Sequence, residues 1–564
     1  MVNLTRRFSR ALFMAATFSL LLFVMTQVYH SSAFYKSGTG LTSWVAGLQP
    51  SISSKLQNPS GSDTGIPKNP KQESSSESGS KVTQNSSLLG KMLGSWWPSP
   101  SVKSREIMAL DFYKGIFTIF DDFRPNVKPL TNYTNGEPAR SEGWDKIPKD
   151  PLTNEYLGKF LQVEKDDVFE LNRCHQGVVD HLPREYPQHL YKGNGVVIVA
   201  GGKFMPMAIA SVKVLRDTGS NLPVEIFLAN NEEYEPKICE KILRQLNARC
   251  VILPEAIGKG ALNKFPLKRY QFKALSLLAS SFENVLLMDA DNYLLKNPEF
   301  IFEQDPFSSK GYVFWSDYWR RATSPYYYQV AGVQLGPRVR NGDPSDKAKE
   351  TPPAADLEHA IPDPSCESGQ LLVSKRMHYK AIILSVYYNL FGPDIYYPLL
   401  SQGSSGEGDK ETFIAGPVFF QEPFYQVSQF IWTLGFVDSS GFHGTAMSQY
   451  DPVEDYAYAV LKTRKEVSTP LFVHNHMPKL NPPENVKNGD FFNKDGERVR
   501  ILGDRKGSKD SIPVDLELLM WQAAQFMVCE MKAVPNAWAD EKENIASVCD
   551  EVKEQVKFLI QTSE

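Results

Sequence analysis

The sequence is short of several features that would point to other classes of protein. It has only six cysteines in 564 residues, and no two of them stand in a Cys-x-x-Cys pair. A disulfide scaffold is therefore excluded, and no zinc site is indicated. The formal net charge is only -4, so no broad basic surface is predicted and nucleic acid is not expected as a partner. No internal repeat is visible.

The one long apolar run stands near the N-terminus. Residues 11–28 are almost entirely apolar, and Arg6, Arg7 and Arg10 precede them. About 17–25 residues suffice to cross a bilayer, and arginines before the span place the N-terminus in the cytosol. We therefore predict a cytosolic tail (1–10), a transmembrane signal anchor (11–28) and a lumenal remainder. A cleaved signal peptide is the alternative, and it leads to the same compartment.

A segment rich in serine, glycine, proline and asparagine follows the apolar run. It extends over residues 29–104, and a composition of this kind cannot bury a core. We predict a flexible stalk there. The composition then becomes that of a globular protein, which predicts a lumenal catalytic domain over residues 105–564.

Two further features agree with a lumenal location. Asn85 and Asn132 begin sequons for N-glycosylation, although such sequons also arise by chance. In an oxidising compartment the nearest cysteine pairs would be Cys239–Cys250 and Cys529–Cys549. Spacing alone does not determine the connectivity, so the pairing stays open.

From residue 195 onward, short apolar segments alternate with segments of helical spacing. Buried strands are predicted over 195–200, 224–228, 250–253 and 285–288, and helices over 204–216, 236–246 and 271–282. This alternation predicts an α/β fold with a mostly parallel central sheet and helices on both faces. Ligands bind beyond the carboxyl ends of the strands in such sheets.

The only Asp-x-Asp sequence of the chain, Asp289-Ala290-Asp291, directly follows the predicted strand 285–288. Two carboxylates one residue apart on a turn can both reach one hard cation, and Mg²⁺ and Mn²⁺ favour such oxygen ligands. A cation there would neutralise the charge of a departing nucleoside diphosphate. The alternative is a structural turn capped by Asn292, but the position after a buried strand favours the metal site.

Two kinds of loop supply further candidates. Gly201 and Gly202 end the first predicted strand, where glycine permits close approach of the backbone to a nucleotide; a plain turn is an equally good explanation. Glu367 and Asp409 lie in loops rich in glycine and serine, which cannot form the interior of a packed element. Carboxylates in such loops suit the binding of acceptor hydroxyls, and Glu411 (or Glu407) could serve equally well.

Several longer motifs carry a resemblance to a known family. They include Leu222-Pro223-Val224-Glu225, Phe314 to Trp319, Ile361 to Ser365, Glu367 to Gln370, Tyr396 to Leu399 and Gly406 to Phe413. Together these segments closely resemble the fungal Golgi α-1,2-mannosyltransferases that branch mannan, which are retaining glycosyltransferases of the GT-A fold. The resemblance covers roughly residues 105–479. Relatives with similar segments form α-1,3 linkages, which is the alternative.

The resemblance implies a GT-A-like (Rossmann-like) domain that binds a nucleotide-sugar. It implies GDP-mannose as the donor, a mannan or N-glycan outer-chain mannose as the acceptor, and manganese as the metal. It also implies a single-pass type II protein of the Golgi membrane, with other Golgi mannosyltransferases as candidate partners. Retention is expected through front-face displacement, with the diphosphate taking the acceptor's proton; a carboxylate nucleophile is the alternative.

The same resemblance implies roles for single residues. Lys273 is expected to approach the donor and Lys479 its diphosphate, and Asp409 falls near the position that faces the reacting carbon. A late histidine is expected to be the third metal ligand, and His476 is preferred to His474 because it lies nearer to Lys479. The candidate site thus comprises Asp289, Asp291 and His476 for the metal, Gly201, Gly202, Lys273, Asp289 and Lys479 for the donor, and Asp409, Glu367 and Glu411 for catalysis.

Two other functions need to be distinguished. A hydrolase of the secretory pathway would need an acid–base carboxylate pair but no Asp-x-Asp metal site, so manganese dependence separates the two. A non-catalytic lumenal protein would bind mannan without turning over GDP-mannose. An aromatic group around Trp315 is a candidate sugar platform, although a core cluster is the favoured interpretation. The C-terminal segment 515–564 has helical spacing and is expected to pack.

Overall fold

The computed structural model describes residues 100–563, apart from residues 145, 342–350, 506–511, 513 and 542–543. The predicted tail, signal anchor and almost all of the stalk lie outside this part of the chain. Within it, no helix combines the length and the apolar character needed to cross a membrane. The first described helix, α3 (Pro100–Asp122), extends across the predicted boundary between stalk and domain at residue 104.

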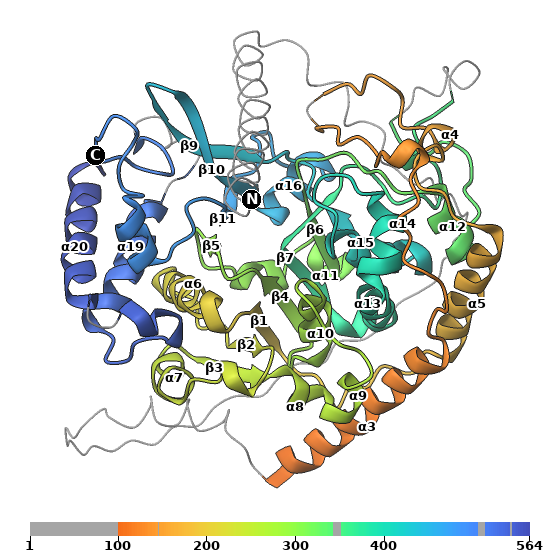
Figure 1. Cartoon of the computed structure of the whole chain (residues 1–564), viewed down its shortest axis with the longest axis horizontal. Helices are drawn as coiled ribbons and strands as arrows, with labels where there is room; N and C mark the ends of the chain where they lie inside the picture. The colour runs from red at the N-terminus through yellow and green to blue at the C-terminus, as the bar shows by residue number, and fades with distance from the viewer. Residues whose placement is uncertain are drawn as a thin grey trace, which may run out of the picture.

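The centre of the domain is a seven-stranded sheet in the order β3-β2-β1-β4-β7-β6-β8 (Figure 1). Its strands are β1 (Asn194–Val199), β2 (Val224–Leu228), β3 (Ala248–Ile252), β4 (Asn284–Met288), β6 (Tyr312–Ser316), β7 (Cys366–Ser374) and β8 (Tyr425–Gln426). The first four are mutually parallel and β8 is parallel to β6, whereas β7 is antiparallel to both of its neighbours. The predicted α/β class with a mostly parallel sheet is confirmed.

Apolar cores cover both faces of this sheet, which explains why the central strands are continuous apolar runs. Side chains alternate along β1: Val196 and Ile198 pack with helices α6 (Met205–Asp217) and α19 (Leu516–Gln525). Val197 packs on the opposite face, in the core that contains α10 (Gln271–Ala279), α13 (Lys375–Leu390) and α15 (Lys410–Phe420).

A second sheet was not predicted from the sequence. It is antiparallel, in the order β5-β11-β10-β9, with β5 (Asn292–Leu294), β9 (Trp432–Asp438), β10 (Gly441–Tyr450) and β11 (Pro470–Asn475). β5 is only three residues long and begins directly after Asp291. β5 pairs with β11. This pairing brings a segment 183 residues later in the chain to the carboxyl end of β4.

Other helices surround the two sheets. They are α4 (Asn154–Leu157), α5 (Lys165–His181), α7 (Leu243–Gln245), α8 (Leu253–Ile257), α9 (Lys259–Leu262), α11 (Phe307–Lys310), α12 (Pro325–Ala331), α14 (Tyr397–Ser401), α16 (Pro452–Ala459), α17 (Pro482–Asn488) and α20 (Ile545–Gln561). The segment predicted as a helix over 236–246 is helical, and it contains a π-helical turn (Ile238–Ile242) followed by α7. The C-terminal helices pack as expected, and Met520 and Ala524 are fully buried.

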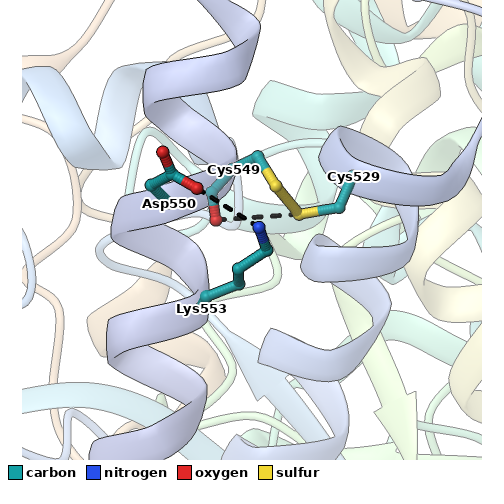
Figure 2. Close-up of a disulfide and its surroundings, with 4 residues drawn as sticks. All are labelled: Cys529, Cys549, Asp550 and Lys553. Carbon is teal, nitrogen blue, oxygen red and sulfur yellow. Dashed lines mark hydrogen bonds and ion pairs between the residues drawn. A yellow bond between two sulfur atoms is a disulfide. The ribbon is translucent and has the colours of Figure 1, made fainter.

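Two disulfides join the cysteine pairs that are nearest in sequence, Cys239–Cys250 and Cys529–Cys549. The first links the π-helical turn to β3. The second links the turn after α19 to α20, and Figure 2 shows it beside Asp550 and Lys553. Sequence separations of 11 and 20 residues correspond to roughly 3 kcal/mol of stabilisation each in the chain-entropy description.

Candidate active site

The Asp-x-Asp turn leaves the sheet at its centre, where β4 lies between β1 and β7. The backbone N–H of Asp289 donates to the carbonyl of Gly369 on β7 (2.8 Å), and Asn292 Nδ2 donates to the same carbonyl (2.8 Å). The turn closes with a bond from the N–H of Asn292 to the carbonyl of Asp289 (3.1 Å). Asn292 thus fixes the turn, as the structural interpretation required, and the carboxylates remain available to a cation.

Pairing of β5 with β11 brings a histidine to the two carboxylates. His474 lies opposite Asn292 in this pairing, and its Nε2 is 3.2 Å from Asp291 Oδ1. Asp289, Asp291 and His474 each offer one ligand atom, and these three atoms lie within 4.8 Å of one another. Two carboxylates and an imidazole form a donor set that suits a divalent cation such as Mn²⁺.

His476, the preferred candidate from the sequence, is not part of this group. β11 ends at Asn475, so His476 follows the strand, and its ring centroid lies 4.5 Å from that of His474. His474 is held against the turn by strand pairing, whereas His476 is exposed. The preference is therefore corrected: the geometry selects His474.

Glu367 was predicted in a loop but lies on strand β7, on the other side of the His474 ring. Its Oε1 is 3.6 Å from His474 Nδ1 and accepts a hydrogen bond from the N–H of Gly369 (2.6 Å). Burial disfavours a charged imidazole, but Asp291 and Glu367 outweigh it and raise the pKa of His474 to about 10. A carboxylate behind a metal-binding imidazole fixes the orientation of the ring. Glu367 is therefore placed to orient His474.

Each carboxylate of the turn also pairs with a lysine. Lys273 Nζ lies 2.7 Å from Asp289 Oδ1 and donates to the carbonyl of Ser368 (3.1 Å). Lys479 forms an ion pair with Asp291. The side chain of Lys273 is 12% exposed and that of Lys479 is 48% exposed. Lys479 is therefore the more accessible of the two lysines.

Asp409 belongs to the same cluster. Ser368 Oγ donates to its Oδ1 (3.3 Å), and its Oδ2 is 3.9 Å from Lys273 Nζ. Burial raises the pKa of Asp409 to about 6, although Lys273 opposes the shift. Ser368, on β7, bridges Lys273 and Asp409 but did not stand out among the sequence candidates, because a single serine carries no local signal of such a role.

Glu411 is removed from the catalytic candidates by its surroundings. Its carboxylate forms an ion pair with Arg321, and both side chains are 2% exposed; Lys410 lies 3.5 Å away. The charge of this buried carboxylate is therefore already balanced inside the fold by Arg321 and Lys410. Trp315 is likewise fully buried, so the core interpretation of that residue holds.

Gly201 and Gly202 lie at the same edge of the sheet as the turn, because β1 pairs with β4 up to Ile198 and Met288. Both glycines have positive φ angles, 124° and 48°. A Cβ at Gly201 would lie 2.2 Å from Oε2 of Glu233. Backbone conformation and this close approach account for the glycine at 201, and the predicted nucleotide contact remains a prediction.

Comparisons with known proteins point to one family. A family model described as "Mannosyltransferase putative" matches residues 193–451. Alpha-1,2-mannosyltransferase MNN21 of Candida albicans is 38% identical over 510 residues, which cover 82% of this chain and 77% of that protein. Alpha-1,2-mannosyltransferase MNN2 of Saccharomyces cerevisiae is 34% identical over 468 residues, 73% of this chain and 77% of that protein.

Among solved structures, the galactosyltransferase LgtC in complex with donor and acceptor sugar analogs is similar with a TM-score of 0.30. It is 12% identical, and the match covers 62% of this chain and 100% of that chain. A likeness of this degree supports no argument about function. The identities to the curated relatives are far higher and extend over most of both chains. The chain is a glycosyltransferase, and it belongs to the family of fungal α-1,2-mannosyltransferases that includes MNN2 and MNN21.

Proposed function

We propose that this enzyme transfers mannose from GDP-mannose to mannose residues of mannan or of an N-glycan outer chain. The proposed product is an α-1,2 branch, formed with retention of configuration in a GT-A-like domain. The observation that carries the proposal is the convergence of Asp289, Asp291 and His474 at the carboxyl end of β4. Lys273 and Lys479 lie beside them, in a chain that belongs to a mannosyltransferase family.

The donor set supports manganese as the metal. Asp289 and Asp291 supply hard oxygen ligands and His474 supplies a nitrogen, a mixture that Mn²⁺ accepts. Glu367 would keep the imidazole of His474 in its binding orientation. When bound, the cation supplies Lewis-acid stabilisation of the departing diphosphate.

Side chains of the protein would bind the donor and stabilise the charges that develop during transfer. Lys479, the more exposed lysine, binds the diphosphate and offsets its charge. Lys273 holds Asp289 in place and approaches the donor sugar. The carboxylate of Asp409 stabilises positive charge at the sugar carbon as the bond to the diphosphate breaks. The acceptor hydroxyl forms the new bond on the same face, and its proton passes to a diphosphate oxygen.

The proposed location is the Golgi membrane, with residues 1–10 in the cytosol, residues 11–28 as the anchor and the catalytic domain in the lumen. Two disulfides support an oxidising compartment. A complex with other Golgi mannosyltransferases is part of the same proposal. Protease protection of the domain in sealed vesicles, and its loss on adding detergent, would test the orientation.

The full-length chain, purified in detergent, would be assayed with GDP-mannose, Mn²⁺ and an α-mannoside, followed by linkage analysis of the product. We expect an α-1,2 linkage, with activity that is lost in EDTA and restored by Mn²⁺. Asp291→Asn should lower turnover by about 100-fold or more. The control Asp217→Asn changes a surface ion pair of α6 and should retain activity.

The other outcomes identify the rival functions. An α-1,3 linkage in the product would show the alternative specificity. Release of mannose from mannosides without a metal would indicate a hydrolase. Binding of mannosides with no turnover of any nucleotide-sugar would indicate a non-catalytic binding protein.

A further inference from the structure

Tyr270 is an aromatic residue at the rim of the candidate site. Its side chain is 52% exposed, and it precedes α10 by one residue, one turn before Lys273. A Cβ at Gly408 would lie 3.4 Å from Cδ2 of Tyr270. Gly408 immediately precedes Asp409, so the ring of Tyr270 lies between the start of α10 and the loop that carries Asp409.

The backbone that presents Tyr270 is firmly held. The side chain of Gln271 is buried, and its Oε1 accepts from the N–H of Lys268 (2.7 Å) while its Nε2 donates to the carbonyl of Asn389 (2.8 Å). Arg269 has a φ of 51°, a left-handed conformation that non-glycine residues keep only where their surroundings impose it. The backbone on both sides of Tyr270 is therefore fixed by its surroundings.

A second tyrosine, Tyr397, is buried. The hydroxyl of Tyr397 donates to Asn389 Oδ1 (2.8 Å). Burial raises the pKa of Tyr397, so its hydroxyl stays protonated and holds the hydrogen bond to Asn389. Of these two tyrosines, Tyr397 is buried and Tyr270 is 52% exposed, so it is Tyr270 that offers an aromatic surface toward solvent.

We propose that Tyr270 binds the acceptor by stacking its ring on a sugar face. Pyranose rings have an apolar C–H face that packs on aromatic side chains, while their hydroxyls reach polar groups. Lys273 and Asp409 are largely buried and lie on the donor side of the proposed reaction. Tyr270 is far more exposed than either of these side chains, so its ring is accessible to a polymeric acceptor. This inference rests on the proposed function, because it names a contact of the same acceptor.

Direct binding tests the idea without relying on turnover. The full-length chain, with GDP and Mn²⁺ present, would be titrated with an α-linked mannobiose by calorimetry, and the KM for mannobiose would be measured alongside. Tyr270→Ala should weaken mannobiose binding and raise its KM at least tenfold, with kcat changed less than threefold. Tyr270→Phe should stay within twofold of wild type, because the ring is retained.

Two controls restrict the interpretation to the acceptor. The dissociation constant of GDP should be the same in every variant. Phe169→Ala removes another exposed aromatic side chain, on α5, and should leave mannobiose binding unchanged. Equal thermal unfolding of Tyr270→Ala and wild type would show that the fold is intact.

The outcomes separate this inference from the proposed function. If wild type transfers mannose but Tyr270→Ala binds mannobiose equally well, the inference is overturned and the proposed function stands. If wild type binds mannobiose through Tyr270 yet never uses GDP-mannose, the inference stands and the proposed function fails. Loss of GDP affinity in Tyr270→Ala, or no mannobiose binding by wild type, overturns the inference.

Discussion

Replacing Asp409 by asparagine is expected to abolish transfer and, at the same time, to stabilise the protein in the absence of metal. The side chain of Asp409 is 5% exposed, and its Oδ2 makes no hydrogen bond within the described part of the chain. Burial raises its pKa from 3.8 to about 6. The folded protein therefore ionises this carboxyl less readily than the unfolded chain does.

The magnitude and sign follow from proton linkage. A carboxyl whose pKa is raised on folding contributes its full stability below the unfolded pKa and loses it as the pH rises through the folded pKa. At about 1.36 kcal/mol per pKa unit, the ionised group of Asp409 costs about 3 kcal/mol at pH 8 and roughly half as much at pH 5. Asparagine cannot ionise, so the gain in stability of Asp409→Asn should increase with pH by this difference.

Urea unfolding in EDTA at several pH values would measure the effect, and turnover of GDP-mannose with Mn²⁺ would measure activity. Turnover should fall about 100-fold or more, because charge stabilisation at the reacting carbon is lost. Asp180→Asn, at an exposed position of α5, is the matched control and should show neither effect. A variant of Asp409 that is less stable at pH 8, or equally stabilised at all pH values, would refute the reasoning.

Three other predictions concern the late histidines, Glu517 and the sequon at Asn132. His474→Ala should raise the Mn²⁺ concentration needed for half-maximal activity at least tenfold, whereas His476→Ala should be mild; equal effects in Mn²⁺ titrations would contradict the assignment. The pKa of the buried Glu517 is raised to about 7 by burial, so wild type should lose stability as the pH rises from about 4.5 through 7. Glu517→Gln should flatten that profile by about 3 kcal/mol in urea unfolding, and an unchanged profile would contradict the shift. Exposed Asn132 should carry an N-glycan that Thr134→Ala removes, visible as the loss of a glycosidase-sensitive gel shift.

The parts of the fold that the sequence predicted are those with local signals. Strands β1, β2 and β4 are buried on both faces, which requires continuous apolar runs, and such runs are visible without any partner. The Asp289 turn could be placed for the same reason, because it follows β4 directly. The boundaries were less secure: the strand predicted to include Leu253 ends one residue earlier, where α8 begins at Leu253 with Pro254 at its first turn.

The parts that the sequence did not predict depend on distant pairing. Choosing between His474 and His476 required the pairing of β5 with β11, and a three-residue strand gives no recognisable period. Glu411 was retained as a candidate because the sequence gives no sign of its buried ion pair. The partner, Arg321, lies ninety positions earlier in the chain. Spacing along the chain favoured the wrong histidine, and it could not show that the carboxylate of Glu411 is already held by an ion pair.

The first residues of β7 hold the proposed metal ligands and the pair Lys273–Asp409 in fixed positions relative to each other. Neighbouring side chains of a strand face opposite sides: Glu367 lies against His474, whereas Ser368 bonds to Lys273 and Asp409. The carbonyl of Gly369 anchors the Asp-x-Asp turn. A Cβ at Gly369 would lie 2.6 Å from His474 Nδ1, so any larger residue would displace the imidazole. Three consecutive residues thus couple the metal ligands to the carboxylate proposed to act at the sugar carbon.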